Sequence, residues 1–207
     1  MRHAIFRPAT VAALSAMTLA SPLGAQTNIP PELEDLKEPR ITTRLPQPML
    51  LVEAKGDPTT VGAQAFGLLF QLYYQSPATP KGSQQPAPRA RWPVEFDQPR
   101  SEWLGIYAIP VPEGMDALPS HTAPPGLKAM LTTWEYGDVA EVLHVGPYNR
   151  EEPTLERLRE FVEGQGYTIT GPHEEEYIRG PTMSGPSDPE QYLTILRYVV
   201  TRDPGAE

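Results

Sequence analysis

One pattern of elements occurs twice along the chain, and this repeat constrains the fold more than any other feature. Each copy contains an apolar strand, a turn, a helix and two further strands, and the copies cover about residues 48–111 and 128–200. A duplicated β-α-β-β unit predicts a pseudo-symmetric α+β domain, with two helices packed on antiparallel sheet. Ligand clefts form readily between two such halves. We therefore expect one domain over residues 48–203 with a cleft between its halves.

The first copy begins with the apolar strand MLLVEAK at 49–55. A Gly-Asp-Pro turn follows it, and Thr59 or Thr60 is positioned to cap a helix. Apolar residues at helical spacing place this helix over 61–75. A proline-rich loop at 76–93 comes next. Two strands complete the copy, at 92–96 and 103–111.

The second copy begins with two apolar segments, 129–136 and 139–145, separated by Gly137-Asp138. This dipeptide is typical of a tight turn, so a hairpin is predicted. Pro153 suits the first position of an amphipathic helix over 154–166. Three strands are expected after this helix, at 167–170, 174–178 and 192–200.

The amino terminus has the pattern of a secretory signal peptide. A basic start precedes an apolar stretch, and small Ala25 is placed for cleavage before Gln26. We expect the mature protein to be periplasmic or secreted. No membrane anchor is expected, because no cysteine follows the apolar stretch and no later segment is long enough to span a bilayer. Residues 26–47 are polar and contain prolines, which indicates a linker or an extended arm.

Charge and composition exclude several classes of function. The chain has a net charge of -9, and removing the first 25 residues with Arg2 and Arg7 leaves 15 basic and 26 acidic side chains, or -11. Such a surface repels phosphate backbones, so no nucleic-acid partner is expected. Cysteine is absent, which excludes disulfides, thiolate metal ligands and a cysteine nucleophile.

Residues 142–178, VLHVGPYNREEPTLERLREFVEGQGYTITGPHEEEYI, resemble the second half of GyrI-like (gyrase-inhibitor-like) effector-binding domains. The resemblance depends on the order of a strand entering Gly146-Pro147-Tyr148, a helix, a Gly171-Pro172 turn and a strand that ends in Tyr177. It implies the same duplicated fold, which the SOUL haem-associated proteins share. It also implies binding of small, often cationic or aromatic molecules, and some members of the family are reported as hydrolases.

The chain departs from that family at two points. No helix-turn-helix precedes the domain, so a transcription factor is not expected, and export argues against inhibition of gyrase. Many members carry a carboxylate near the start of the last strand, where this chain has Ile195. Arg197 shares a strand face with Ile195 by alternation. The resemblance therefore implies a neutral or anionic ligand rather than a cation, unless Glu175 or Glu141 points inward.

Four aromatic residues are the strongest candidates for lining the cleft. Trp134 and Tyr136 share a strand face, Tyr148 lies in the turn before the second helix, and Tyr177 lies on the strand that often borders the pocket of the family. Aromatic rings stack on flat or cationic ligands. Packing in the core is the alternative for each of them.

Carboxylates form the second group of candidates. Alternation places Glu175 and Tyr177 on one strand face and Glu174 and Glu176 on the other, so Glu175 is a candidate to replace the missing carboxylate. A solvated acidic edge is the alternative. Glu141 is a single acid in an apolar strand and points either into the cleft or into solvent. Together with Ile195, these residues complete the candidate ligand-binding set.

A small-molecule-binding module is the function that these features favour. A hydrolase that uses Glu175 or Glu141 as general base is the alternative from the enzymes, although no catalytic motif is present and no catalytic residue is assigned. An envelope interaction module with the 76–93 loop or the 26–47 arm as contact is the third. Three of the four histidines, His121, His144 and His173, follow the predicted signal peptide, and because their spacing is not convergent, no metal site is predicted. No cofactor is expected, and a haem with His144 as axial ligand is the alternative.

Overall fold

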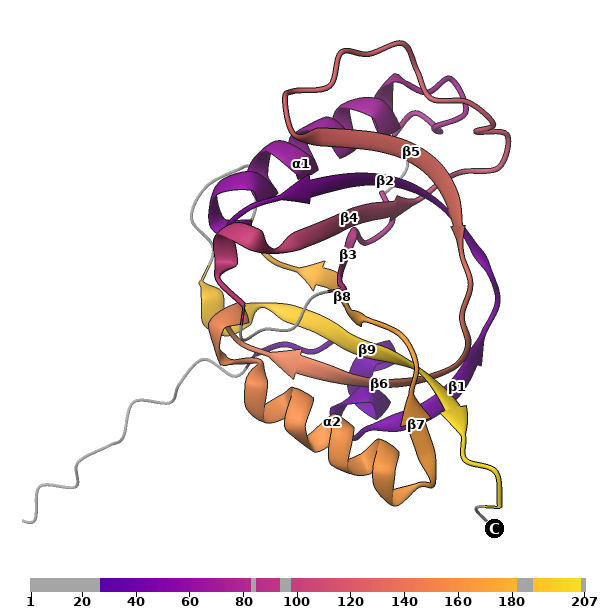
Figure 1. Ribbon diagram of the computed structural model, residues 1–207, viewed down its shortest axis with the longest axis vertical. Helices are drawn as coiled ribbons and strands as arrows, with labels where there is room; N and C mark the ends of the chain where they lie inside the picture. Colours follow the sequence, from indigo (N-terminus) through magenta and orange to yellow (C-terminus); the bar gives the residue numbers. More distant parts are fainter. Residues whose placement is uncertain (1–26, 83–84, 94–97, 182–187, 206–207) are drawn as a thin grey trace, which may run out of the picture.

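The computed structural model describes residues 27–82, 85–93, 98–181 and 188–205, and it forms an α+β fold (Figure 1). Two α-helices, α1 (Pro58–Gln75) and α2 (Glu152–Gly164), accompany nine antiparallel strands in this part of the chain. The strands are β1 (Arg40–Arg44), β2 (Gln47–Lys55), β3 (Arg89–Trp92), β4 (Leu104–Pro110), β5 (Leu127–Trp134), β6 (Gly137–Val145), β7 (Tyr167–Ile169), β8 (His173–Arg179) and β9 (Leu193–Arg202). Short 3-10 helices are η1 (Pro31–Lys37), η2 (Arg100–Glu102), η3 (Tyr148–Arg150) and η4 (Pro189–Gln191).

The internal repeat organises the sheet. Strand order is β1-β6-β9-β8-β3-β4-β2-β5, with β7 paired to β9. The two units, β2-α1-β3-β4 and β6-α2-β8-β9, have the same pairing, because the last strand of each lies between the other two. Strands β3 and β8 pair antiparallel and join the halves, with Ala90 opposite Glu175. The predicted α+β architecture of two β-α-β-β units is therefore confirmed.

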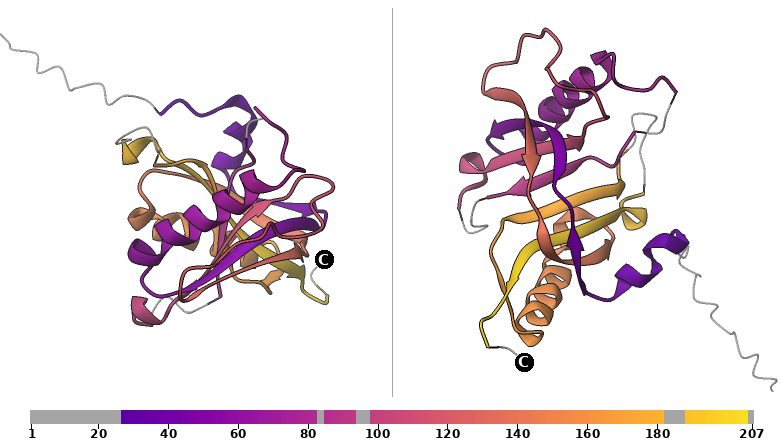
Figure 2. Two further views of the ribbon diagram at one scale, coloured as in Figure 1. Left: turned by 90° about the horizontal axis from the view of Figure 1, so that it is seen from above. Right: turned by 90° about the vertical axis from the view of Figure 1, so that its right-hand side faces the viewer.

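Two long connections bend from one half of the sheet to the other. Strand β1 continues into β2, and β5 continues into β6, and the two pairs run antiparallel along each other, as Figure 2 shows. Arg44 lies opposite Gly137, and Gln47 opposite Trp134. The hairpin predicted at Gly137-Asp138 is wrong, because β5 pairs with β2 while β6 pairs with β1 and β9. Gly137 has a φ of 72°, which suits a sharp bend without strain.

Each helix covers one half, and the two lie at opposite ends of the molecule in Figure 1. Helix α1 begins at Pro58, where the side chain of Asp57 accepts a hydrogen bond of 2.9 Å from the Thr59 amide, so Asp57 rather than Thr59 or Thr60 is the cap. Pro153 lies in the first turn of α2, as expected. The buried stripes are Ala65, Leu68, Leu69 and Leu72 in α1 and Leu155, Leu158 and Val162 in α2.

Residues 27–47 are part of the folded domain rather than a linker. Strand β1 pairs with β6 along its whole length. Helix η1 places Leu33 and Leu36 against Leu143, Leu193 and Ile195, and together these side chains form a small buried cluster. Fully burying a leucine contributes about 1.5–3 kcal/mol, so this segment stabilises the second half of the sheet.

Two predictions fall at the limits of the described chain. The predicted signal peptide lies entirely outside the described residues. The strand expected over 92–96 is displaced, because β3 ends at Trp92, and residues 94–96 are outside the description. Neither helix of the described residues is long and apolar enough to cross a membrane.

Candidate functional site

Aromatic and carboxyl side chains gather where the two halves meet, on the sheet face that the helices cover. We call this group the seam cluster. Glu175 and Tyr177 come from β8 and Tyr107 from β4, while Glu151 directly precedes α2 and makes no side-chain capping hydrogen bond. The full set is Phe66, Trp92, Tyr107, Tyr148, Glu151, Glu175, Tyr177 and Tyr192.

The rings of the seam cluster touch one another continuously from the first half to the second. Centroid distances are 5.7 Å for Trp92–Tyr107, 4.9 Å for Tyr107–Phe66, 5.8 Å for Phe66–Tyr177, 5.5 Å for Tyr177–Tyr148 and 5.2 Å for Tyr148–Tyr192. Gly105 makes room for this arrangement, since a Cβ there would lie 2.7 Å from Tyr107 Cε2. These rings therefore form a continuous row across the seam, which we call the aromatic wall.

Two carboxyl groups lie buried against this wall. Glu151 and Glu175 are 6% and 7% exposed. Burial, together with the charge of Glu175, raises the pKa of Glu151 to about 9. Burial also raises the pKa of Glu175 to about 7, against the opposing effects of Tyr177 and Trp92. The pair therefore retains at least one proton at neutral pH.

No cation compensates this pair within the described residues. Neither Glu151 nor Glu175 forms an ion pair with a lysine or arginine there. His173 Nδ1 lies 4.0 Å from Glu175 Oε1, but burial, with the charge of Arg159, lowers the pKa of His173 to about 3, so the ring is neutral. Ionisable groups perturbed by burial in this way are typical of functional sites.

Several polar atoms of the seam cluster also lack hydrogen-bond partners among the described residues. They are Trp92 Nε1, the Tyr107 hydroxyl and Glu151 Oε1, all buried. Trp92 Nε1 lies close enough to Glu175 to lower the carboxyl pKa, but without the geometry of a normal hydrogen bond. A buried polar atom without a partner costs about 1–3 kcal/mol, which a bound molecule with matching groups would offset.

The tyrosine hydroxyls remain protonated over the physiological range. Burial raises the pKa of Tyr107 to about 12, and the charges of Glu175 and Asp57 add to this effect. Burial and the charge of Glu175 also raise the pKa values of Tyr148 and Tyr177. The seam cluster thus offers hydroxyl donors beside carboxylate acceptors.

The structure divides the seven predicted site residues between two faces of the sheet. Tyr148, Tyr177 and Glu175 lie together in the seam cluster. Alternation along β8 is as expected, since Glu174 and Glu176 point to the other face. The other four predicted residues lie on that opposite face, which α1 and α2 do not cover: Trp134, Tyr136, Glu141 and Ile195.

Ile195 does not belong to the seam cluster. Its side chain packs under Leu33 and Leu36 of η1. Arg197, on the same strand face, does not reach a cleft rim but is completely buried and paired with glutamates. The alignment that put the missing family carboxylate at position 195 therefore points to the wrong face.

Sequence reasoning did not single out Glu151, Tyr107 or Trp92. Glu151 follows the Gly-Pro-Tyr turn by three positions, and this spacing is the signal that places it beside Tyr148. Tyr107 and Trp92 belong to the first repeat, and only the antiparallel pairing of β3 with β8 brings them to Glu175.

A buried ion network occupies the opposite face. Arg197 pairs with Glu141, Glu174 and Glu176 at 3.0, 2.6 and 2.9 Å. Arg91 pairs with Glu174 at 2.8 Å. Burial raises the pKa values of Glu141 and Glu174, but the arginines lower them more, so both carboxyls have pKa values below the usual range. The solvated acidic edge considered for 174–176 is therefore wrong.

Possible metal ligands do not cluster in the described part of the chain, and His144 is engaged inside the fold. It contains no group of three or more His, Asp and Glu side chains arranged to hold a metal ion. His144 is buried, and its Nδ1 and Nε2 already contact the Thr154 hydroxyl and the Pro147 carbonyl at 3.0 and 3.3 Å. The proposed axial ligand for haem is thus engaged inside the fold.

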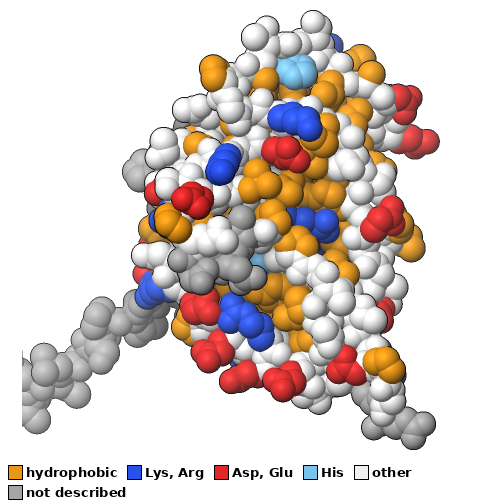
Figure 3. Space-filling view, viewed as in Figure 1, with side chains coloured by type: hydrophobic (Ala, Val, Ile, Leu, Met, Phe, Trp, Pro, Cys, Tyr) orange, Lys and Arg blue, Asp and Glu red, His pale blue; other side chains and the backbone are white. Residues whose placement is uncertain are grey.

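Figure 3 shows the surface in the orientation of Figure 1. Hydrophobic side chains gather over the middle of this face, where the strands of the two halves meet, and Asp and Glu side chains lie mostly toward its edges. An apolar surface of this kind, ringed by polar groups, is typical of a binding site.

Solved structures share this fold. An uncharacterized conserved protein from Listeria innocua has a TM-score of 0.65 and 22% identity, covering 80% of this chain and 93% of that one. A hydrolase from Listeria innocua has a TM-score of 0.61 and 21% identity, covering 80% and 92%. The C-terminal domain of EcmrR has a TM-score of 0.52 and 14% identity, covering 80% and 98%. No family model and no curated protein sequence matches the chain.

Proposed function

We propose that the seam cluster binds a small organic cation with an apolar or aromatic body, and that the protein is a GyrI-like effector-binding module. The observation that carries this proposal is the pair Glu151 and Glu175, which is buried against an aromatic wall without a cation among the described residues. The likeness of the fold to the EcmrR C-terminal domain and the resemblance of residues 142–178 support the family assignment.

Electrostatics favour a cation over other ligands. An ionised carboxylate in an apolar environment is costly unless a positive charge accompanies it. A ligand cation would supply that charge beside Glu175, and the faces of Tyr107, Tyr148 and Tyr177 would add cation–π attraction. Binding would shift Glu175 to its ionised form and release a proton.

The sequence favoured a neutral or anionic ligand unless Glu175 or Glu141 pointed inward. Glu175 meets that condition, because its side chain lies with Tyr177 in the seam cluster. Glu141 does not, because Arg40, Arg44 and Arg197 surround it on the other face. The proposal therefore assigns the family's carboxylate role to Glu175 on β8.

Export to the periplasm is part of the proposal, supported by the signal-peptide pattern of the first 25 residues. In that compartment the module would capture small molecules at the envelope. Cell fractionation and the amino-terminal sequence of the mature protein test this step. A mature chain that begins near Gln26 in the periplasmic fraction is expected, and an unprocessed cytoplasmic chain would refute it.

Hydrolysis is the second candidate function. A carboxyl group with a pKa near 7 is suited to act as a general base at physiological pH, and Glu175 has this property beside the Tyr148 and Tyr177 hydroxyls. A structure from Listeria innocua with this fold is described as a hydrolase. Turnover of electrophilic test substrates that disappears in Glu175→Gln would support catalysis, and turnover that persists would exclude Glu175 as the base.

A thermal-unfolding screen tests the binding proposal. Matched aromatic cations, neutral molecules and anions are added to the purified protein, because a ligand of the native state raises the unfolding midpoint. Cations are expected to stabilise most. If no cation in a broad panel stabilises the protein, or if anions do so equally, the proposed ligand class is wrong.

A further inference from the structure

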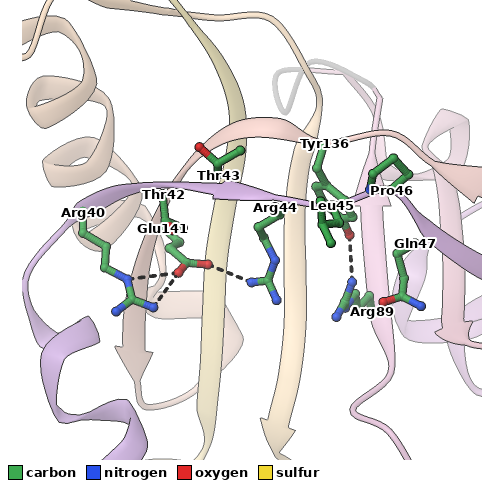
Figure 4. A pocket seen from close by; sticks show the side chains of 10 residues that line it. All are labelled: Arg40, Thr42, Thr43, Arg44, Leu45, Pro46, Gln47, Arg89, Tyr136 and Glu141. Atoms are coloured by element: carbon green, nitrogen blue, oxygen red, sulfur yellow. Dashed lines mark hydrogen bonds and ion pairs between the residues drawn. The ribbon is translucent and has the colours of Figure 1, made fainter.

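A hollow lies on the sheet face opposite the seam cluster, beside the bend between β1 and β2. It has a volume of about 540 Å³. Figure 4 shows that Arg40 and Arg44 of β1 and Arg89 of β3 project to the same side of this bend, with Gln47 and Tyr136 close by. The pocket is thus built by segments that are distant in the sequence.

The lining of this pocket is positively charged, although the whole chain has a net charge of -9. It contains three guanidinium groups, from Arg40, Arg44 and Arg89, and one carboxylate, from Glu141. Three positive charges and one negative charge leave a local excess of two. An acidic protein that concentrates arginines in one hollow creates a local field that attracts anions.

Glu141 pairs with Arg40 and Arg44, so its single negative charge offsets only part of the positive charge of the three arginines. Its two oxygens already accept five hydrogen bonds, two from Arg40, one from Arg44 and two from Arg197. A carboxylate has about four lone-pair positions, so its capacity is used. Buried Arg197 of β9 shares the charge of Glu141 with the two arginines of β1.

Arg89 provides a buried donor without an acceptor. Its side chain is 7% exposed. One terminal nitrogen donates to the Tyr136 hydroxyl at 2.8 Å, and the other forms an ion pair with Glu176 at 3.3 Å. Nε is buried and has no hydrogen-bond partner among the described residues. A guanidinium that is held in place with one donor unused is prepared to bind an oxygen acceptor.

We propose that this pocket is an oxyanion site, separate from the seam cluster, that takes the carboxylate, sulfate or phosphate group of a small molecule. Arg44 and Arg89 hold the anion by charge-assisted hydrogen bonds, and Gln47 and Thr42 supply neutral donors. Leu45 and Pro46 border the pocket and leave space for an apolar substituent. The site depends on the amino-terminal segment, because β1 supplies two of the three arginines.

Thermal unfolding at constant ionic strength tests this site. Phosphate, sulfate and benzoate are compared with chloride on the wild-type protein, Arg44→Gln and Arg44→Lys. Arg157→Gln is the matched control, because Arg157 lies exposed on α2. At least one oxyanion is expected to raise the midpoint of thermal unfolding, and this effect should saturate as the oxyanion concentration increases. The apparent Kd is expected to increase about tenfold in Arg44→Gln, as the loss of a charge-assisted hydrogen bond predicts, less in Arg44→Lys, and not at all in the control.

The same series separates the ligand classes and the two sites. A larger effect of benzoate than of phosphate assigns the pocket to carboxylates, and the reverse order assigns it to phosphate or sulfate groups. Glu175→Gln should leave oxyanion binding unchanged, whatever becomes of the cation proposal. The oxyanion site is refuted if no oxyanion exceeds chloride, or if Arg44→Gln and Arg157→Gln bind equally well.

Discussion

Arg197 of β9 lies directly opposite Glu141 of β6, and its guanidinium donates two hydrogen bonds to Glu141 Oε2, at 3.1 and 3.0 Å. The same guanidinium pairs with Glu174 and Glu176 of β8. One fully buried cation thus connects three adjacent strands of the second half.

Removing this cation should severely destabilise the fold. Arg197→Met would leave buried carboxylates without their main counter-charge, and breaking a buried ion pair in this way costs about 3–5 kcal/mol. Urea denaturation measures the change in the free energy of unfolding. The exposed Arg202→Gln variant should stay within about 0.5 kcal/mol of the wild type. A loss below about 1 kcal/mol in Arg197→Met would show that the network contributes little.

The amino-terminal segment should contribute measurably to stability. Leu36 is 3% exposed and packs on Leu193 and Ile195, so Leu36→Ala should lower the free energy of unfolding by about 2 kcal/mol or more. Leu45 in the same segment is 84% exposed, and Leu45→Ala should change the free energy by less than about 0.5 kcal/mol. Equal effects of the two substitutions would mean that η1 does not pack as described.

Stability should fall as the pH rises from 7 to 9. The pKa of Glu151 is about 9 in the folded protein and has an ordinary value of 4.5, so the folded state holds a proton in this window that the unfolded state has lost. A group whose folded pKa is raised in this way loses stabilisation with rising pH, by up to about 1.4 kcal/mol per unit.

Substitution identifies the group responsible for this pH dependence. Glu151→Gln cannot ionise, so its free energy of unfolding should decrease less between pH 7 and 9 than that of the wild type. Glu152→Gln removes the neighbouring exposed carboxyl and should retain the full decrease. Parallel curves for all three proteins would show that the Glu151 carboxyl is not perturbed.

Local sequence patterns predicted both α-helices and most strands, but they missed β1, displaced β3 and did not predict which strands are neighbours. Helical spacing located α1 and α2 within three residues at each end, because the buried stripe is a local property. A glycine at position 137 is compatible with two structures, a hairpin turn and a bend in a chain that crosses between the sheet halves. What decides between a hairpin and a crossing strand is that β5 pairs with β2 while β6 pairs with β1 and β9. That choice of partners is a property of the whole sheet.

In the candidate site, too, the local pattern was predictable and the long-range contacts were not. Alternation correctly separated Glu175 from Glu174 and Glu176, because a strand has a fixed period. It gave no sign that Trp134 and Tyr136 belong with the ion network, where Arg91 lies 3.8 Å above the Trp134 ring. It also gave no sign that the charge of Glu175 acts on Glu151, since that approach depends on how α2 packs against β6 and β9.

Direct titration of an organic cation tests the central claim, that Glu175 is the carboxylate of a cation site. Calorimetry compares benzyltrimethylammonium with phenylmethanesulfonate, an anion of similar size, on the wild type, Glu175→Gln and the exposed-control variant Glu156→Gln. We predict that the wild type binds the cation in preference to the anion, and more weakly as the pH falls below 7, because Glu175 then becomes protonated. The affinity should fall at least about tenfold in Glu175→Gln and remain unchanged in Glu156→Gln. Cation binding of equal strength in Glu175→Gln and the wild type would contradict the account.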